Sequence, residues 1–117
     1  MATIAEVTAS VSEAFGIPVA DIRGYSRERR FVEARHCAFV LARQETSLSL
    51  PDIGRYFSGR DHTSVAHGLR AWGDKTTRNP DLHDALRVAE NNLFVRRGGV
   101  FSRGTWLPVF KSVRSKA

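Results

Sequence analysis

The sequence predicts an all-α fold of about six helices that includes a helix-turn-helix. Three observations indicate this fold class. Apolar residues recur at three- and four-residue steps along several segments. Helix start and stop signals separate those segments, and no long run alternates as a strand would. With 117 residues, the chain is long enough for one modest core and too short for two.

The first half of the chain predicts two long helices with a short one between them. A helix over 3–15 carries its apolar residues on one face, and Gly16 and Pro18 end it. A short turn of helix is expected around 19–22, before Gly24 opens a basic loop. The second long helix runs over 31–44. The apolar residues of its inner face are Phe31, Ala34, Cys37, Ala38 and Leu41.

The second half predicts three more helices. Ser49 and Pro51 begin a short one over 50–57, with Ser49 as its cap and Pro51 in its first turn. A tight turn at 58–59 leads to a helix over 61–75. Asn79-Pro80 caps a last helix that ends at Gly98-Gly99, with an apolar stripe of Leu82, Leu86, Ala89 and Leu93.

Two regions follow from this pattern: a helical domain over 1–97 and a basic, aromatic-containing tail over 98–117, which we expect to be flexible. Trp106 lies in the tail with Phe101 and Phe110. Basic residues interleaved with aromatics suit a nucleic acid, a membrane surface or a protein partner, or fold back onto the domain. The tail's role stays open at this point.

The charge of the chain points to a polyanionic partner. Its net charge is +6 and its pI about 10.4. Residues 1–94 hold as many acidic as basic residues, whereas residues 95–117 hold six basic residues and no acidic one. A second, local cluster consists of Arg23, Arg27, Arg29 and Arg30.

Several function classes are disfavoured. The single cysteine, Cys37, excludes an internal disulfide, and neither a signal peptide nor a membrane-length apolar run is present, so we expect a cytoplasmic protein. The histidines lack metal-ligand spacing, which predicts no metal, and no cofactor is implied. Asp61, His62 and Ser64 imitate triad residue types, but neighbours on one helix are poorly placed for triad geometry. We expect no enzyme activity.

The helices over 50–57 and 61–75 form the expected helix-turn-helix, whose second helix enters the major groove of DNA. Val65, Leu69 and Trp72 face the core at helical spacing, so Thr63, His67 and Arg70 point outward. A helix face that only contacts solvent more usually carries Glu and Lys, so the composition of this face favours a binding role. Asp61 is either the helix N-cap or an acceptor from a cytosine amino group, and one residue can do both.

The run from Leu48 to Val65, LSLPDIGRYFSGRDHTSV, resembles the signature of the DNA-binding C-terminal domain of the bacterial replication initiator DnaA. The likeness covers roughly residues 3–94. It implies recognition of a short A·T-rich duplex box similar to TTATCCACA. It also implies that Asp61, His62 and Thr63 read bases in the major groove and that Arg27 enters the adjacent minor groove. We add His67 to the base-reading set because it shares their outward face.

The same resemblance implies a second set of residues at or near the phosphates: Arg35, His36, Arg43, Leu50, Pro51 and Ser64. Three positions depart from the family pattern. His36 stands where Gln is usual, Ser58 replaces a Gly, and Ser64 replaces a Thr. We expect the contribution of His36 to depend on pH. We expect these three departures to affect which DNA box sequence the protein prefers.

No G-x-x-x-x-G-K-[ST] phosphate loop occurs in the sequence, so the ATPase portion of the initiator is absent. Met1 before a complete first helix, and a tail beyond the family's usual end, favour a stand-alone protein over an excised domain. Two functions fit. One is a nucleoid-associated DNA-binding regulator that occupies initiator boxes at origins or promoters. The other is an interaction protein that copies the initiator's terminal domain and engages the initiator or the proteins controlling its ATP state.

Overall fold

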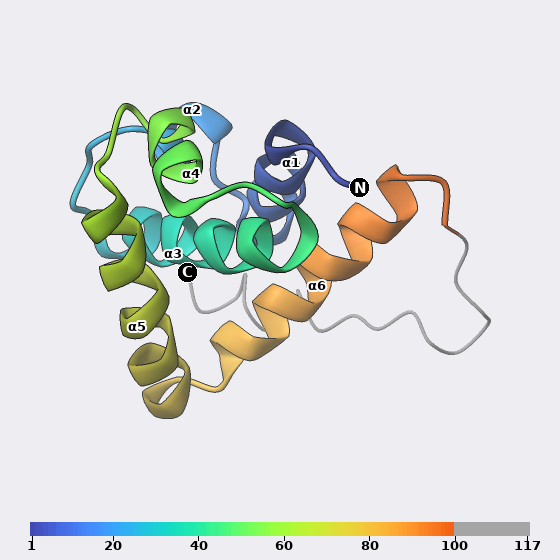
Figure 1. Ribbon diagram of the computed structural model, residues 1–117. Helices are drawn as coiled ribbons and strands as arrows, with labels where there is room; N and C mark the ends of the chain where they lie inside the picture. The colour runs from blue at the N-terminus through green and yellow to red at the C-terminus, as the bar shows by residue number, and fades with distance from the viewer. Residues whose placement is uncertain (100–117) are drawn as a thin grey trace.

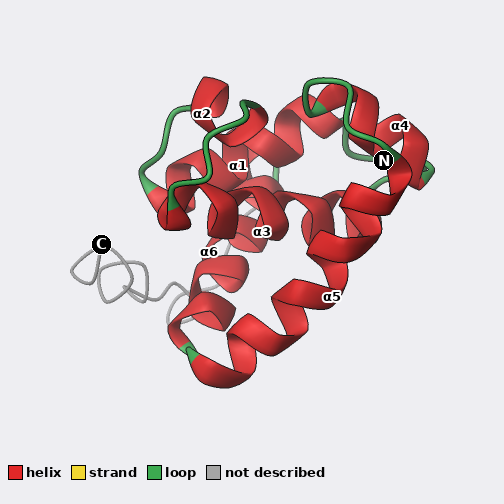
Figure 2. Ribbon diagram, turned by 90° about the vertical axis from the view of Figure 1, so that its left-hand side faces the viewer, coloured by secondary structure: helices red, strands yellow, loops and turns green. Residues whose placement is uncertain are grey.

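The computed structural model describes residues 1–99, and within them it contains six α-helices and no strand (Figures 1 and 2). This confirms the predicted fold class. The tail that we predicted lies, from residue 100 onward, outside the described residues. The helices are α1 (Ile4–Phe15), α2 (Val19–Arg23), α3 (Arg29–Glu45), α4 (Leu50–Tyr56), α5 (His62–Arg78) and α6 (Asp81–Arg96).

Two helices are longer than predicted. α3 begins at Arg29 instead of Phe31, and α5 continues to Arg78 instead of ending near Lys75. The last turn of α5 contains Thr76 and Thr77, whose hydroxyls donate to carbonyls of the preceding turn and so need no competing partner outside the helix. The helix then stops at the residue before a proline, where the helical conformation is disfavoured.

Side-chain caps fix the starts of three helices. The Thr3 hydroxyl accepts from the Glu6 amide at 3.1 Å while the Glu6 carboxylate accepts from the Thr3 amide at 2.9 Å, which is a capping box on α1. Ser49 caps α4 as predicted, accepting from the amide of residue 52 at 3.3 Å. The third is α5, which Asp61 caps. α6 begins instead with Pro80 at its N-cap position, and the Asn79 side chain just before it accepts from the Asp81 amide at 3.2 Å.

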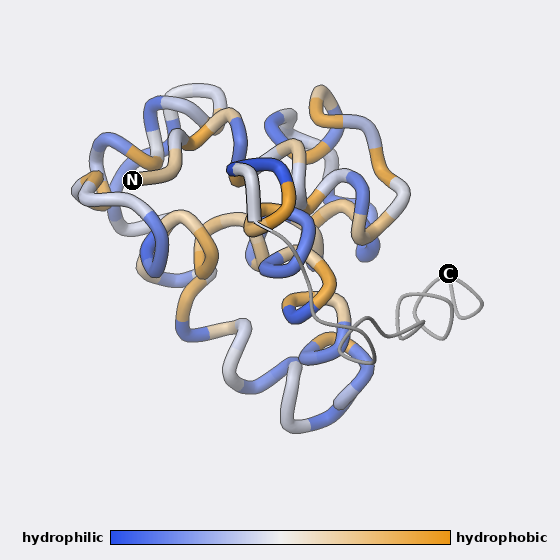
Figure 3. Tube along the Cα trace, turned by 90° about the vertical axis from the view of Figure 1, so that its right-hand side faces the viewer, coloured by the Kyte–Doolittle hydropathy of each residue, from blue (hydrophilic) through white to orange (hydrophobic). Residues whose placement is uncertain are grey.

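α3 is the central helix and contacts each of the other five (Figure 1). Its residues 34–39 are buried without a break, as expected for a helix covered on more than one side. The tube in Figure 3 alternates between hydrophobic and hydrophilic colours along the surrounding helices, which is the pattern of amphipathic elements. Cys37 is fully buried in this core, as predicted, and burial raises the pKa of its thiol.

α1 and α6 pack along each other and carry two interhelical ion pairs. Arg96 donates to Glu13 at 2.6 Å, and Arg97 donates to Glu6 at 2.9 Å. Arg96 and Arg97 are two of the six basic residues of the segment 95–117, and both are paired with acids of α1. The local positive charge at the end of α6 is therefore partly neutralised.

Candidate nucleic-acid interface

A close backbone approach joins α4 to α5. The Arg60 amide donates to the Gly54 carbonyl at 2.8 Å, and a Cβ at Gly54 would overlap the Arg60 carbonyl oxygen. Only glycine fits there. The turn itself contains two consecutive residues in the left-handed region, Ser58 with φ 65° and Gly59 with φ 71°. This turn sets the direction in which α5 leaves α4.

Asp61 is the N-cap of α5. Its Oδ1 accepts from the Thr63 amide at 2.7 Å and from the Thr63 hydroxyl at 2.9 Å, and the His62 Nδ1 lies 3.4 Å away. The hydrogen bonds from the Thr63 amide and hydroxyl lower the pKa of Asp61. Of the two interpretations offered above, the structure shows the cap. Acceptance from a cytosine amino group stays a prediction.

The outer face of the first turns of α5 carries the predicted readout residues. Asp61, His62, Thr63, Ser64 and His67 are all exposed, whereas Val65 is fully buried and Trp72 is buried on the opposite side. Arg70 is exposed further along α5. The amphipathic pattern therefore placed the two faces of this helix correctly.

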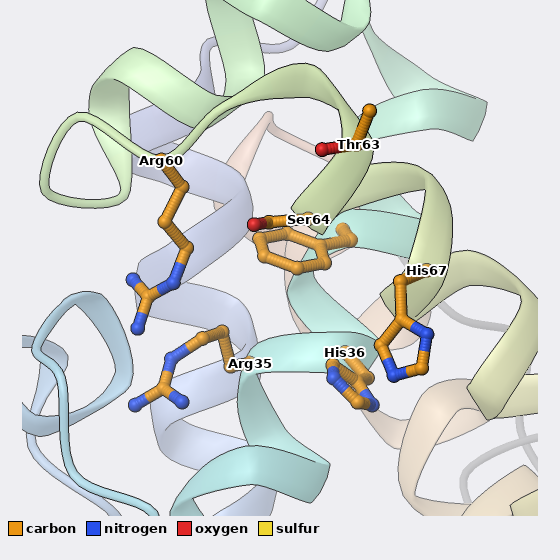
Figure 4. Close-up of a pocket in the computed structure, with 7 residues that line it drawn as sticks. Arg35, His36, Arg60, Thr63, Ser64 and His67 are labelled. Atoms are coloured by element: carbon orange, nitrogen blue, oxygen red, sulfur yellow. The ribbon is translucent and has the colours of Figure 1, made fainter.

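A shallow hollow of about 400 Å³ lies against this face, between α3, α5 and the turn before α5 (Figure 4). Its polar lining combines hydroxyls, imidazoles and guanidinium groups and contains no carboxylate. Backbone amides at the start of α5 add partial positive charge. The hollow is suited to an anion such as a phosphate group. It is lined by Arg35, His36, Phe39, Arg60, Thr63, Ser64 and His67.

Arg35 lines the hollow from beneath the surface. Its side chain is buried, and it donates to the carbonyls of Ile22 at 2.8 Å, Ser26 at 3.1 Å and Asp21 at 3.2 Å. Burial, together with the nearby charge of Arg60, lowers the pKa of Arg35 to about 10, where it is still protonated at neutral pH. This geometry holds the loop after α2 in place.

His36 is also buried, and the structure does not support the pH sensitivity that we expected of it. Burial lowers the pKa of His36 to about 3, with the charges of Lys75 and its other basic neighbours acting in the same direction. The side chain is therefore neutral across the physiological range. The Lys75 ammonium lies 3.3 Å from the His36 Nδ1, which assigns Nδ1 as the acceptor.

The loop between α2 and α3, which contains Arg27, lies on the same side of the molecule as the turn before α5 (Figure 1). Arg27 is exposed and, within residues 1–99, no hydrogen bond or ion pair engages it. Its neighbours differ. Arg29 pairs with Glu33 at 3.4 Å, and Arg30 lies 3.8 Å from Glu28. Arg27 is thus the most available arginine of the predicted cluster.

The remaining predicted residues lie at helix ends around this face. Arg43 is exposed in the last turn of α3, Pro51 is exposed in the first turn of α4, and Leu50 beside it is half-buried against the core. The structure does not gather these three into the hollow. They occupy separate positions on α3 and α4.

Sequence reasoning missed several residues that shape the site. Arg23 and Arg60 each hold backbone carbonyls across the gap between α2 and the turn, and neither was given a role. Gly68 also shapes the site, because a Cβ there would come within 2.6 Å of the Phe39 ring and 2.8 Å of the His36 ring. A glycine inside an otherwise strong helix pattern is the one signal that a close approach was needed.

Within residues 1–99, no group of three or more His, Cys, Asp or Glu side chains is arranged to hold a metal ion. In the same range, no helix is long and apolar enough to cross a membrane.

Comparison with known proteins places this surface in a family. Residues 4–71 match the family model described as the bacterial dnaA protein helix-turn-helix. A chromosomal replication initiator protein DnaA from Ruegeria sp. is 48% identical over 91 residues, which cover 78% of this chain and 19% of that protein. The protein of the same name from Cereibacter sphaeroides is 40% identical over 86 residues, covering 74% and 19%.

A more distant relative, the DnaA protein of Latilactobacillus sakei, is 35% identical over 91 residues, covering 78% of this chain and 20% of that protein. The chain therefore spans about a fifth of the length of the curated relatives that it matches. The family match includes α4, the turn and the first half of α5, which carry the exposed face described above.

Proposed function

Since this chain belongs to the bacterial DnaA helix-turn-helix family, we propose that it binds double-stranded DNA at A·T-rich boxes similar to TTATCCACA. One observation carries the proposal: an exposed row of groups suited to base edges begins α5, directly beside a loop that presents Arg27, which has no ion pair or hydrogen bond within residues 1–99. The function is binding, without a catalytic step. Occupation of chromosomal boxes would place the protein on the nucleoid, in the cytoplasm.

The base-reading groups are Asp61, His62, Thr63 and His67 in the major groove, with Arg27 in the neighbouring minor groove. A narrow A·T minor groove has an enhanced negative potential, which favours an unpaired guanidinium. The duplex backbone would lie against Ser64, the exposed Arg43 and the start of α4 at Leu50 and Pro51. Arg35 and His36 support this surface from beneath, because their side chains are buried.

A competition assay tests the proposal. The protein is bound to a box-containing duplex and challenged with the same duplex or a scrambled one, over a range of salt concentrations. We expect a clear preference for the box and a fall of log K with log salt. Thr63→Ala should cost about 1–3 kcal/mol on the box and erase much of the preference. Arg87→Ala on α6 is the matched control, since Arg87 pairs with Asp84 away from this surface. Equal affinity for both duplexes would sink the proposal.

The regulatory consequence is also a proposal. These 117 residues contain no phosphate loop, so on its own the segment would occupy a box without an ATPase. It would then oppose the initiator by mass action at comparable affinity and concentration. Overproduction should reduce origin firing, and the double variant His62→Ala, Thr63→Ala should abolish that effect. An effect that survives in the double variant would instead favour contacts with the initiator or its regulators.

A further inference from the structure

The Arg60 guanidinium bridges the end of α2 and the turn after α4. It donates to the Arg23 carbonyl at 3.2 Å and to the Gly24 carbonyl at 2.6 Å, and within its own turn to the Phe57 carbonyl at 2.8 Å. The acceptors are carbonyls at the ends of helices, which lack partners inside the helix. One side chain therefore ties two segments that are far apart in the sequence.

A second set of contacts runs in the opposite direction across the same gap. The Arg23 Nε donates to the Tyr56 carbonyl at 2.8 Å, and its guanidinium lies 4.0 Å from the centre of the Tyr56 ring. The Ser58 hydroxyl donates to the Arg23 carbonyl at 2.5 Å, and the Tyr25 hydroxyl donates to the Ser58 carbonyl. These reciprocal bonds make the loop and the turn one rigid unit.

Arg60 occupies a special place within that unit. It immediately precedes Asp61, the N-cap of α5, and its own amide is held by Gly54. On the other side, the Gly24 carbonyl that it holds begins the loop carrying Arg27. The position of Arg60 therefore relates the first turn of α5 to that loop.

We infer that Arg60 is a positioning residue which sets the distance between the Arg27 loop and the base-reading end of α5, so that the two grooves of one box are read together. The inference rests on the proposed function. It assigns Arg60 an indirect role: the guanidinium acts on carbonyls of the protein, and Arg27 makes the contact with DNA. Burial, which lowers the pKa of Arg60, agrees with a side chain turned inward.

Direct phosphate binding by Arg60 is the competing explanation, because Arg60 also lines the hollow beside α5. The two differ in one measurable respect. A phosphate ligand contributes to affinity whether or not Arg27 is present. A residue that acts through the Arg27 loop contributes little once Arg27 has been removed.

The experiment compares Arg60→Ala, Arg27→Ala and the double variant on boxes with single base-pair replacements. In the unmodified protein, a replacement at the A·T end should weaken binding about tenfold. In Arg60→Ala, a replacement at the A·T end should no longer weaken binding. Replacements of base pairs that α5 contacts should weaken binding as much as they do in the unmodified protein. The double variant should match Arg27→Ala in both affinity and salt slope. Loss of stability alone would not remove the penalty at one end of the box.

Arg60→Lys serves as a second variant in case the alanine variant does not fold. Lysine keeps the charge but cannot bridge three carbonyls in the same fork, so we expect a partial loss of the A·T-end penalty. Arg87→Ala is again the control. Full activity of Arg60→Lys, or a further drop of about one unit of salt slope in the double variant, would show a phosphate ligand and overturn the inference. If the unmodified protein shows no box preference, the proposed function has failed instead.

Discussion

The Thr63 hydroxyl donates to the Asp61 carboxylate at 2.9 Å, on the same oxygen that accepts the Thr63 amide. This pair completes the cap of α5 and uses the one hydrogen-bond donor of the Thr63 side chain. The Thr63 methyl group then points away from the hollow (Figure 4). Thr63 thus presents an apolar group at the position where the family likeness implies base contact, and a thymine methyl is the matching group on DNA.

We expect Thr63→Ser and Thr63→Val to separate the two parts of this side chain. Serine keeps the bond to Asp61 but loses the methyl, so it should show most of the loss of about 1–3 kcal/mol expected for Thr63→Ala on the box. Valine keeps the methyl, and Asp61 still caps α5 through the amide of residue 63, so box affinity should stay close to that of the unmodified protein. Titration of a labelled duplex measures both.

The control for Thr63 lies in the DNA. Replacing the box thymines one at a time by uracil removes a single methyl. At the thymine that Thr63 contacts, this replacement should weaken the unmodified protein and leave Thr63→Ser unaffected. A larger loss for valine than for serine would mean that the hydroxyl is the reading group.

Gly68 and Gly73 lie on the same helix, and replacing each by alanine should have opposite effects on stability. A Cβ at Gly68 would meet the Phe39 and His36 rings at 2.6 and 2.8 Å, whereas one at Gly73 would have no neighbour within 4 Å among residues 1–99. Gly68→Ala should therefore destabilise the protein by about 1–3 kcal/mol through overpacking. Gly73→Ala should stabilise it by about 0.5–1 kcal/mol through helix propensity. Urea unfolding measures the change in the free energy of unfolding for both variants. Two changes of the same sign would contradict the packing of α5 on α3.

The contrast between Gly68 and Gly73 shows which features of the fold could be predicted from the sequence and which could not. Helix positions and the outward face of α5 depend on local spacing, so the pattern around Val65 and His67 was sufficient for them. The role of Arg35 depends on carbonyls of residues 21, 22 and 26, which only the folded chain brings to it. The family signature marked Arg35 as important, but its burial follows from tertiary packing and not from spacing. Arg60 is missed for the same reason.

At Ser58 the sequence departs from the family, which usually has glycine there. The structural cost of this departure can be measured. Its φ of 65° is in the left-handed region, which costs a residue with a side chain about 1–2 kcal/mol relative to glycine. Its hydroxyl compensates by donating to the Arg23 carbonyl at 2.5 Å. Ser58→Gly loses the bond and gains the backbone freedom, so it should stay near the stability of the unmodified protein. Ser58→Ala loses the bond and keeps the strain.

We therefore expect Ser58→Gly to be more stable than Ser58→Ala by about 1 kcal/mol, measured by chemical denaturation. Both variants lack the hydroxyl, so the comparison isolates the backbone. An alanine variant as stable as the glycine variant would mean that the turn relaxes out of the left-handed conformation. The family's glycine would then need another explanation.

Replacing His36 by the family's usual glutamine should change how stability depends on pH. In the folded protein, burial lowers the pKa of His36 to about 3, from an ordinary value of 6.5. Below pH 6.5 the unfolded chain takes up a proton that the folded chain does not, so His36 makes the folded state less stable as the pH falls. The loss applies between those two values, at a rate of up to about 1.4 kcal/mol per pH unit.

His36→Gln removes this titration, so its free energy of unfolding should fall less steeply from pH 6 to pH 4 than that of the unmodified protein. The comparison uses slopes, because the substitution also alters packing against Gly68 and with it the absolute stability. Carboxylates such as Asp61 contribute equally to both proteins and cancel. The matched control is His83→Gln on α6, which makes the same exchange at an exposed side chain. Parallel slopes for His36→Gln and the unmodified protein would mean that His36 is hydrated in the folded state, with the contact between α3 and α5 open enough to admit water.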